Sequence, residues 1–179
     1  MKTAVLVIDV QHALCTGDYA ALDARGVIER INEVTDKARA AGAPVIFIQH
    51  ESDGDVLEHG SDGWQLAHGL KVLTTDLSMR KTATDSFHHT ALQAMLAGLD
   101  IKGLVICGLQ SDFCVDTTTR RALGLGFPVT LVSDAHSTIA NEVLSAEQII
   151  GHHNVTLANI DSFGVRVTLT KAREVAFEA

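Results

Sequence analysis

The sequence is poor in aromatic residues, prolines and basic residues, and each scarcity excludes a class of protein. Aromatic residues make up 4% of the 179 residues, and 14 Lys and Arg stand against 22 Asp and Glu, a formal net charge of −8. Nucleic-acid binding depends on basic contacts to phosphate and, for single strands, on aromatic stacking, so we expect no nucleic-acid partner. With only two prolines and 46% hydrophobic residues, the chain is neither disordered nor of low complexity.

Long hydrophobic runs are also absent. The first apolar run, residues 4–8, is interrupted by Asp9 and is too short for the core of a signal peptide. No stretch of the sequence approaches the roughly 20 apolar residues of a membrane-spanning helix. We therefore expect a cytoplasmic protein that has no membrane partner.

The cysteines are few, namely Cys15, Cys107 and Cys114. An odd number of cysteines in a cytoplasmic chain argues against a disulfide framework, and no CxxC pair or Cys/His spacing indicates a zinc site. Cys107 lies in the apolar run LVIC and is expected in the core, whereas Cys114 leaves open a catalytic thiol.

What the sequence does contain is a regular alternation of apolar, strand-like runs with segments of helical periodicity. We expect strands at residues 3–9, 45–48, 79–82, 103–107, 129–132 and 165–169, and helices at 24–41, 90–99, 113–125 and 145–157. Residues 51–78 are rich in Gly, Asp and Ser and are expected to form a long loop. The alternation predicts that residues 1–179 form one α/β domain, a parallel sheet with helices on both faces.

In such folds the ligand lies beyond the carboxyl ends of the strands, where the strand order reverses. For the usual order 3-2-1-4-5-6, this point lies between Asp9 and the turn that carries Cys114. A cysteine at a helix start gains thiolate stability from the macrodipole, and free N–H groups there can bind an oxyanion. Asp9 can accept the thiol proton, and Lys81 can stabilise both charges. The plainer alternatives are an inert packed thiol, a turn aspartate and a surface lysine.

Three segments of the chain resemble the isochorismatase-like cysteine hydrolases, which include nicotinamidases, carbamoylases and streptothricin hydrolase-type amidases. They are AVLVIDVQ around Asp9, KTATDSFHHTAL from Lys81, and LVICGLQSDFCVDTTTRRALGLGFPVTLVSDAHST around Cys114. The resemblance implies a three-layer α/β/α fold with a six-stranded parallel sheet and a catalytic triad of Asp9, Lys81 and Cys114. It also implies a cis peptide bond from Leu109 to Gln110, an oxyanion hole formed by the N–H groups of Gln110 and Cys114, and a homodimer or homotetramer.

Nine histidines raise the question of a metal site. The nicotinamidase branch of this family binds a divalent metal through an Asp and several His after the second strand, but the Asp-x-His pattern is missing from that region here. His50, His59 and His68 follow no known ligand spacing, so we expect no metal and no cofactor. His136, in SDAHST, is expected to make structural hydrogen bonds near the site or a subunit contact.

The candidate residues for the substrate pocket are Gln11, His50, Trp64, Phe87 and Phe113. Gln11 should face the crevice because it lies two positions after the carboxylate that ends the first strand. The two phenylalanines flank the predicted lysine and cysteine and could line an apolar slot. Trp64, the only tryptophan, is either a substrate wall or an anchor of a small core within the long loop.

The expected function is hydrolysis of a C–N bond in an amide, lactam or carbamoyl group of a small molecule, through an acyl thioester on Cys114. Hydrolysis of a vinyl ether, as in isochorismatase, is the alternative, although that branch does not use a cysteine nucleophile. A catalytically silent scaffold and a flavodoxin-like nucleotide carrier are further alternatives. The carrier is disfavoured because the turn after the first strand has neither GxGxxG nor GxxxxGK[ST].

Overall fold

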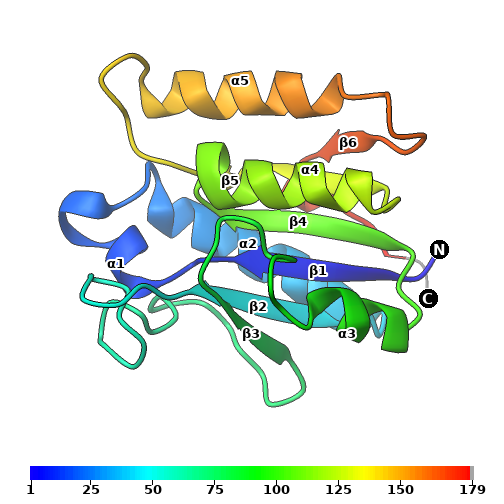
Figure 1. Ribbon diagram of the computed structural model, residues 1–179, viewed down its shortest axis with the longest axis horizontal. Coiled ribbons are helices and arrows are strands. Elements are labelled where there is room, and N and C mark those ends of the chain that lie inside the picture. Colours follow the sequence, from blue (N-terminus) through cyan, green and yellow to red (C-terminus); the bar gives the residue numbers. More distant parts are fainter. Residues whose placement is uncertain (178–179) are drawn as a thin grey trace.

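The computed structural model describes residues 1–177 and contains one six-stranded sheet. Its strands are β1 (Thr3–Ile8), β2 (Val45–His50), β3 (Leu77–Lys81), β4 (Gly103–Leu109), β5 (Val129–Ser137) and β6 (Val167–Thr170). All neighbouring strands run parallel, in the order β3-β2-β1-β4-β5-β6 (Figure 1). This confirms the predicted parallel sheet, and the strand order is the usual one assumed for such folds. The last two residues of the predicted domain, 178–179, lie outside the described residues.

Helices cover both faces of the sheet, which makes three layers (Figure 1). They are α1 (His12–Cys15), α2 (Ala24–Ala40), α3 (Leu92–Gly98), α4 (Asp116–Gly124) and α5 (Ala146–Ala158), with short turns η1 (Gly17–Tyr19), η2 (Ser111–Val115) and η3 (Ala172–Glu174). α2 and η3 pack on one face, and α3, α4 and α5 pack on the other. No helix within residues 1–177 has the length and apolar character needed to cross a bilayer.

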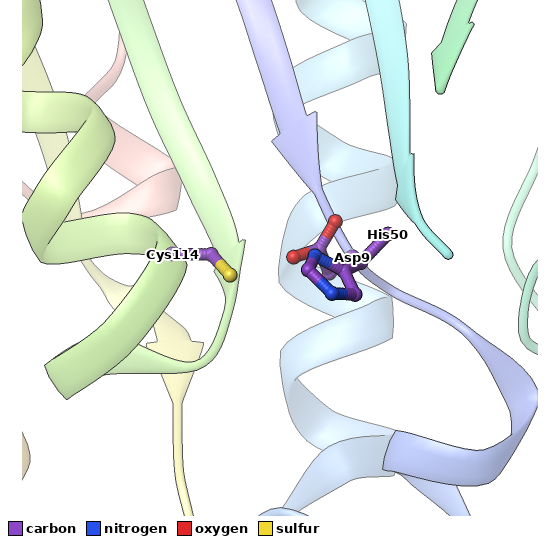
Figure 2. Close-up of side chains that lie close together, drawn as sticks. All are labelled: Asp9, His50 and Cys114. Atoms are coloured by element: carbon purple, nitrogen blue, oxygen red, sulfur yellow. The ribbon is translucent and has the colours of Figure 1, made fainter. Parts of the chain in front are cut away.

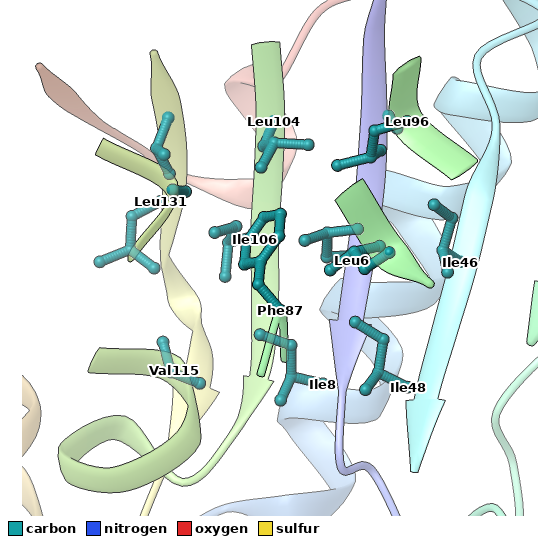
Figure 3. Close-up of a cluster of buried hydrophobic side chains, with 14 of the residues drawn as sticks. Leu6, Ile8, Ile46, Ile48, Phe87, Leu96, Leu104, Ile106, Val115 and Leu131 are labelled. Atoms are coloured by element: carbon teal, nitrogen blue, oxygen red, sulfur yellow. The ribbon is translucent and has the colours of Figure 1, made fainter. Parts of the chain in front are cut away.

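The central strand β1 is buried on both faces, which explains its continuous apolar sequence. Ala4, Leu6 and Ile8 join the cluster beneath α3, α4 and α5, part of which Figure 3 shows. Val5 and Val7 alternate with them and join the cluster beneath α2. Each fully buried large aliphatic side chain stabilises the fold by roughly 1.5–3 kcal/mol, so β1 is a firmly held element. The residue that follows it, Asp9, therefore has a well-determined position.

Several elements differ from the predicted bounds in ways that concern the crevice. β2 continues beyond its expected end to His50, and β5 continues to Ser137. The helix expected at 113–125 is divided into the π-helical turn η2 and the regular helix α4, which begins only at Asp116. Sequence periodicity does not distinguish these cases, because polar residues at a strand end and a single wide helical turn leave the apolar pattern unchanged.

Gly108 permits the close approach of β1 and β4 at the end where the crevice opens. Its φ is +118°, and a Cβ atom placed on it would lie 2.1 Å from the carbonyl oxygen of Ile8. Only glycine combines this backbone conformation with that contact. The position thus brings together the chain segments that follow the two central strands.

We predict that Gly108→Ala lowers the free energy of unfolding by at least about 3 kcal/mol, because the added methyl group collides with rigid backbone of β1. Gly126→Ala is the matched control, since Gly126 also has a positive φ but has open space at its Cβ position. Gly126→Ala should lower the free energy of unfolding by about 1–2 kcal/mol. Urea denaturation measures the free energy of unfolding of both variants, and an equal loss of stability in the two would contradict the close-contact explanation.

Candidate active site

Four strand ends bring four chemically active side chains to one edge of the sheet. Asp9 follows β1, His50 ends β2, Lys81 ends β3, and Cys114 lies in η2 after β4. Asp9 has a positive φ of 51°, and its N–H donates to the carbonyl of Ile48 at 2.8 Å. Figure 2 shows Asp9, His50 and Cys114 converging on the same space. Parallel strands end at one edge, so residues far apart in the sequence meet there.

The Lys81 ammonium lies at the centre of this group. Its Nζ is 2.7 Å from Asp9 Oδ2, 3.1 Å from His50 Nδ1 and 3.2 Å from Cys114 Sγ. An ammonium has three donors, and these three contacts use all of them. The Lys81 side chain is 0% exposed, so the buried charge depends on these partners for its stability.

Asp9, His50 and Cys114 together have the chemistry of a metal-ligand set. Their ligand atoms all lie within 4.8 Å of one another. Lys81 Nζ, however, lies within hydrogen-bonding distance of all three, in the position that a cation bound by them would take. The cluster therefore contains its own cation as part of the chain, and its geometry fits an ammonium.

The Asp9 carboxylate has one oxygen engaged and one oxygen free. Oδ2 accepts from Lys81, whereas Oδ1 is buried and has no hydrogen-bond partner among the residues that the structure describes. A buried acceptor without a partner costs free energy that a proton donor would recover. This oxygen is accordingly placed to accept a proton or an N–H group.

Burial sets the protonation states of the other two groups. Burial, followed by the Asp9 charge, raises the pKa of the Cys114 thiol to about 12, against the opposing effect of Lys81. Burial and the Lys81 charge lower the pKa of His50, so its ring is neutral and its Nδ1 accepts from Lys81. Burial of the thiol thus opposes the thiolate expected at a helix start, and the regular helix α4 begins only two residues beyond Cys114.

The turn before Cys114 has an unusual backbone. The peptide bond from Leu109 to Gln110 is cis, which is the bond at which the family resemblance places one. The Gln110 carbonyl accepts from the N–H groups of Phe113 and Val115, both at 3.1 Å, which closes η2. The Gln110 N–H donates to no residue within the described part of the chain, so it is available to a ligand.

A sequence model of the isochorismatase domain matches residues 3–161. The chain belongs to the isochorismatase family. A crystal structure of an isochorismatase family protein, 36% identical, superposes with a TM-score of 0.86 over 94% of this chain and 98% of that chain.

The relatives of this chain include proteins that are named as hydrolases. A streptothricin hydrolase of Streptomyces noursei is 38% identical over 75% of this chain and 49% of that protein. The ureidoacrylate amidohydrolase RutB of Agrobacterium fabrum is 29% identical over 75% of each chain. The chain spans about half the length of the streptothricin hydrolases that it matches, at 49% and 54%. The family is thus one of hydrolases, and it includes amidohydrolases.

In this isochorismatase-family structure a pocket of about 170 Å³ opens above the cysteine. It is lined by Asp9, Leu14, His50, Leu57, Thr84, Gln110, Phe113 and Cys114. His50 and Phe113 are thus among the lining residues, as expected. Leu14, Leu57 and Thr84 were not foreseen, because nothing in the loop sequences shows which side chains turn toward the crevice.

The other three candidate pocket residues have structural contacts instead. Gln11 is fully buried, and its side-chain amide donates to the carbonyls of His50 and Trp64 at 2.9 Å and accepts from the N–H of His50 at 2.9 Å. Trp64 packs its ring edge-on against His59, with the ring centres 4.7 Å apart. Phe87 lies in the core (Figure 3), and its ring is stacked on that of Phe127. Gln11 therefore fastens the long loop to β2 rather than facing the pocket.

A hydrogen-bonded chain behind η2 supports the cysteine turn. Ser111 Oγ lies 2.8 Å from His136 Nδ1, and His136 Nε2 lies 3.1 Å from Asn154 Oδ1. Asn154 in turn donates to the carbonyl of Ser133 at 3.1 Å. Because the amide oxygen of Asn154 needs a donor, His136 carries its proton on Nε2 and accepts from Ser111. His136 thus makes the structural hydrogen bonds expected of it, whereas Ser111 and Asn154 carried no signal in the sequence.

We predict that Lys81→Met destabilises the fold by roughly 3–5 kcal/mol, because it leaves the Asp9 carboxylate buried without its cation. Adding Asp9→Asn to Lys81→Met should recover part of that loss, since no charge is then left unpaired. Urea denaturation of the two single variants and the double variant gives the coupling. Strictly additive losses would show that the two side chains do not depend on each other.

We predict that alkylation of Cys114 by iodoacetamide accelerates about tenfold per pH unit between about pH 7 and pH 10, because the buried thiol stays protonated over this range. The readout is the labelling rate of this cysteine, followed by peptide mass spectrometry. The small thiol 2-mercaptoethanol serves as the reference for the reagent. A rate that is already level below about pH 8 would mean that the resting group is a thiolate.

Proposed function

We propose that the protein is a thiol-dependent hydrolase that cleaves a C–N bond of a small molecule, in an amide, lactam or carbamoyl group. The observation that carries this proposal is the contact of one buried ammonium, Lys81, with both the Asp9 carboxylate and the Cys114 sulfur. This arrangement supplies a nucleophile, a base and an electrostatic partner beside a pocket. Relatives named as a streptothricin hydrolase and an amidohydrolase add support.

In the first half of the proposed reaction, the Cys114 sulfur attacks the carbonyl carbon while its proton passes to Asp9 Oδ1. Because burial raises the thiol pKa, the proton leaves during the attack rather than before it. The negative oxygen that forms is held by the N–H groups of Gln110 and Cys114. Lys81 keeps its positive charge next to the sulfur and the carboxyl group throughout.

The tetrahedral intermediate then collapses. The C–N bond breaks, protonated Asp9 gives its proton to the departing nitrogen, and an acyl thioester remains on Cys114. Asp9, again a carboxylate, takes a proton from a water molecule that attacks the thioester. The C–S bond breaks, the sulfur recovers a proton from Asp9, and the acid product leaves. Water is the only co-reactant consumed.

We predict that Cys114→Ala abolishes the hydrolysis of primary amides, carbamoyl amines and lactams, with at least about a 10³-fold loss, and leaves the fold intact. Cys15→Ala is the matched control, because Cys15 lies in α1 outside the pocket lining. That variant should keep wild-type turnover. Ammonia, amine and acid products are quantified for each substrate.

Two results would overturn the proposal. Undiminished amide hydrolysis by Cys114→Ala would exclude the thioester. Absence of any amide hydrolysis, together with cleavage of isochorismate that survives Cys114→Ala, would establish the vinyl ether hydrolase instead.

A further inference from the structure

The lining of the pocket contains one formal charge, the Asp9 carboxylate. His50 is neutral, since burial and the Lys81 charge lower its pKa, and the remaining lining side chains are apolar or uncharged. Leu14, Leu57 and Phe113 supply the apolar walls. A ligand that enters therefore meets a mostly apolar surface and one acidic oxygen.

The nearby cations are already paired. All three donors of Lys81 are taken by Asp9, His50 and Cys114, and its side chain is fully buried. Arg80, the preceding residue of β3, contacts His59 Nε2 at 2.6 Å and lies 3.5 Å from a carboxylate oxygen of Glu51. Successive residues of a strand point to opposite faces, so Arg80 is directed away from Lys81. Neither cation is free to bind a ligand.

A carboxylate in this pocket would be poorly stabilised. Apolar walls remove its hydration, and burying a charge without a partner is costly. The unpartnered Asp9 Oδ1 would add like-charge repulsion at short range. An amide N–H, by contrast, satisfies the same oxygen with a hydrogen bond.

We propose that this pocket selects small amides, lactams or carbamoyl compounds whose other substituents carry no negative charge. The inference rests on the proposed thiol hydrolysis and narrows it to a substrate class. The pocket volume of about 170 Å³ also limits the size of the substrate. It is smaller than the range of about 300–1,000 Å³ typical of sites for drug-sized ligands.

Matched amides that differ only in charge test the selectivity. Succinamide and succinamate are nearly isosteric, with a second amide in one and a carboxylate in the other, and β-alaninamide replaces that group by an ammonium. After correction for the two amides of succinamide, we expect kcat/KM for succinamate to be at least about 30-fold lower than for succinamide. β-Alaninamide should be cleaved faster than succinamate. Equal or faster cleavage of succinamate than of succinamide would overturn the inference.

A cation added at the rim should weaken the discrimination against a carboxylate. Phe113 lines the pocket and is 52% exposed, so a longer polar side chain fits there without disturbing the core. Phe113→Arg should lower the ratio of kcat/KM for succinamide to kcat/KM for succinamate at least about tenfold, because the arginine supplies the missing partner for the carboxylate. Phe113→Gln, polar but uncharged, is the matched control and should leave the ratio near that of the wild type. Equal ratios for the two variants would contradict the charge-based explanation.

A second readout does not depend on turnover. Iodoacetamide and iodoacetate differ only in charge, and their labelling rates at Cys114 are compared at about pH 8 by mass spectrometry, relative to their rates with 2-mercaptoethanol. We expect the ratio of the iodoacetate rate to the iodoacetamide rate to be at least about tenfold lower at Cys114 than with 2-mercaptoethanol. Such a result without any amide hydrolysis would overturn the proposed function while supporting the charge selectivity of the pocket. Equal relative rates would overturn the selectivity even in an active amidase.

Discussion

The buried ammonium of Lys81 is the interaction on which the candidate active site depends. It donates to a carboxylate, an imidazole and a sulfur, and each acceptor belongs to a different chain segment. A charge removed from water in this way is stable only when it is paired and hydrogen-bonded. The carboxylate, the sulfur and the neutral ring are consequently parts of one electrostatic unit, and each of them contacts the same central charge.

The sheet topology makes this unit possible. Strands β1, β2 and β3 are neighbours and end at the same edge, while β4 lies on the other side of β1 and leads into the cysteine turn. Gly108 lets the backbones of β1 and β4 approach closely where they end. Behind the turn, the chain from Ser111 through His136 to Asn154 connects it to β5 and α5. The cysteine turn is thus connected to the sheet and to a flanking helix.

Burial connects the chemistry of the site with its selectivity. The same loss of solvent that raises the pKa of the Cys114 thiol also leaves Asp9 Oδ1 without a partner. In the proposed reaction, these two consequences cooperate, because a protonated thiol needs a base at short range and Asp9 has an oxygen free to be one. The apolar walls that cause the burial also disfavour an anionic ligand.

The sequence by itself determined the parallel sheet, because continuous apolar strands that alternate with amphipathic helices are typical of an α/β fold, whereas the strand order came from the usual order of such folds and is shown by the structure. It also marked Asp9, where the first apolar run stops, and the turn that carries Cys114, while the family resemblance assigned Lys81 to the same site. Only the tertiary structure decided which loop side chains line the pocket, that Gln11 fastens the long loop and that Phe87 lies in the core. These features depend on contacts between distant segments. The protonation of the thiol likewise depends on burial, which exists only in the folded chain.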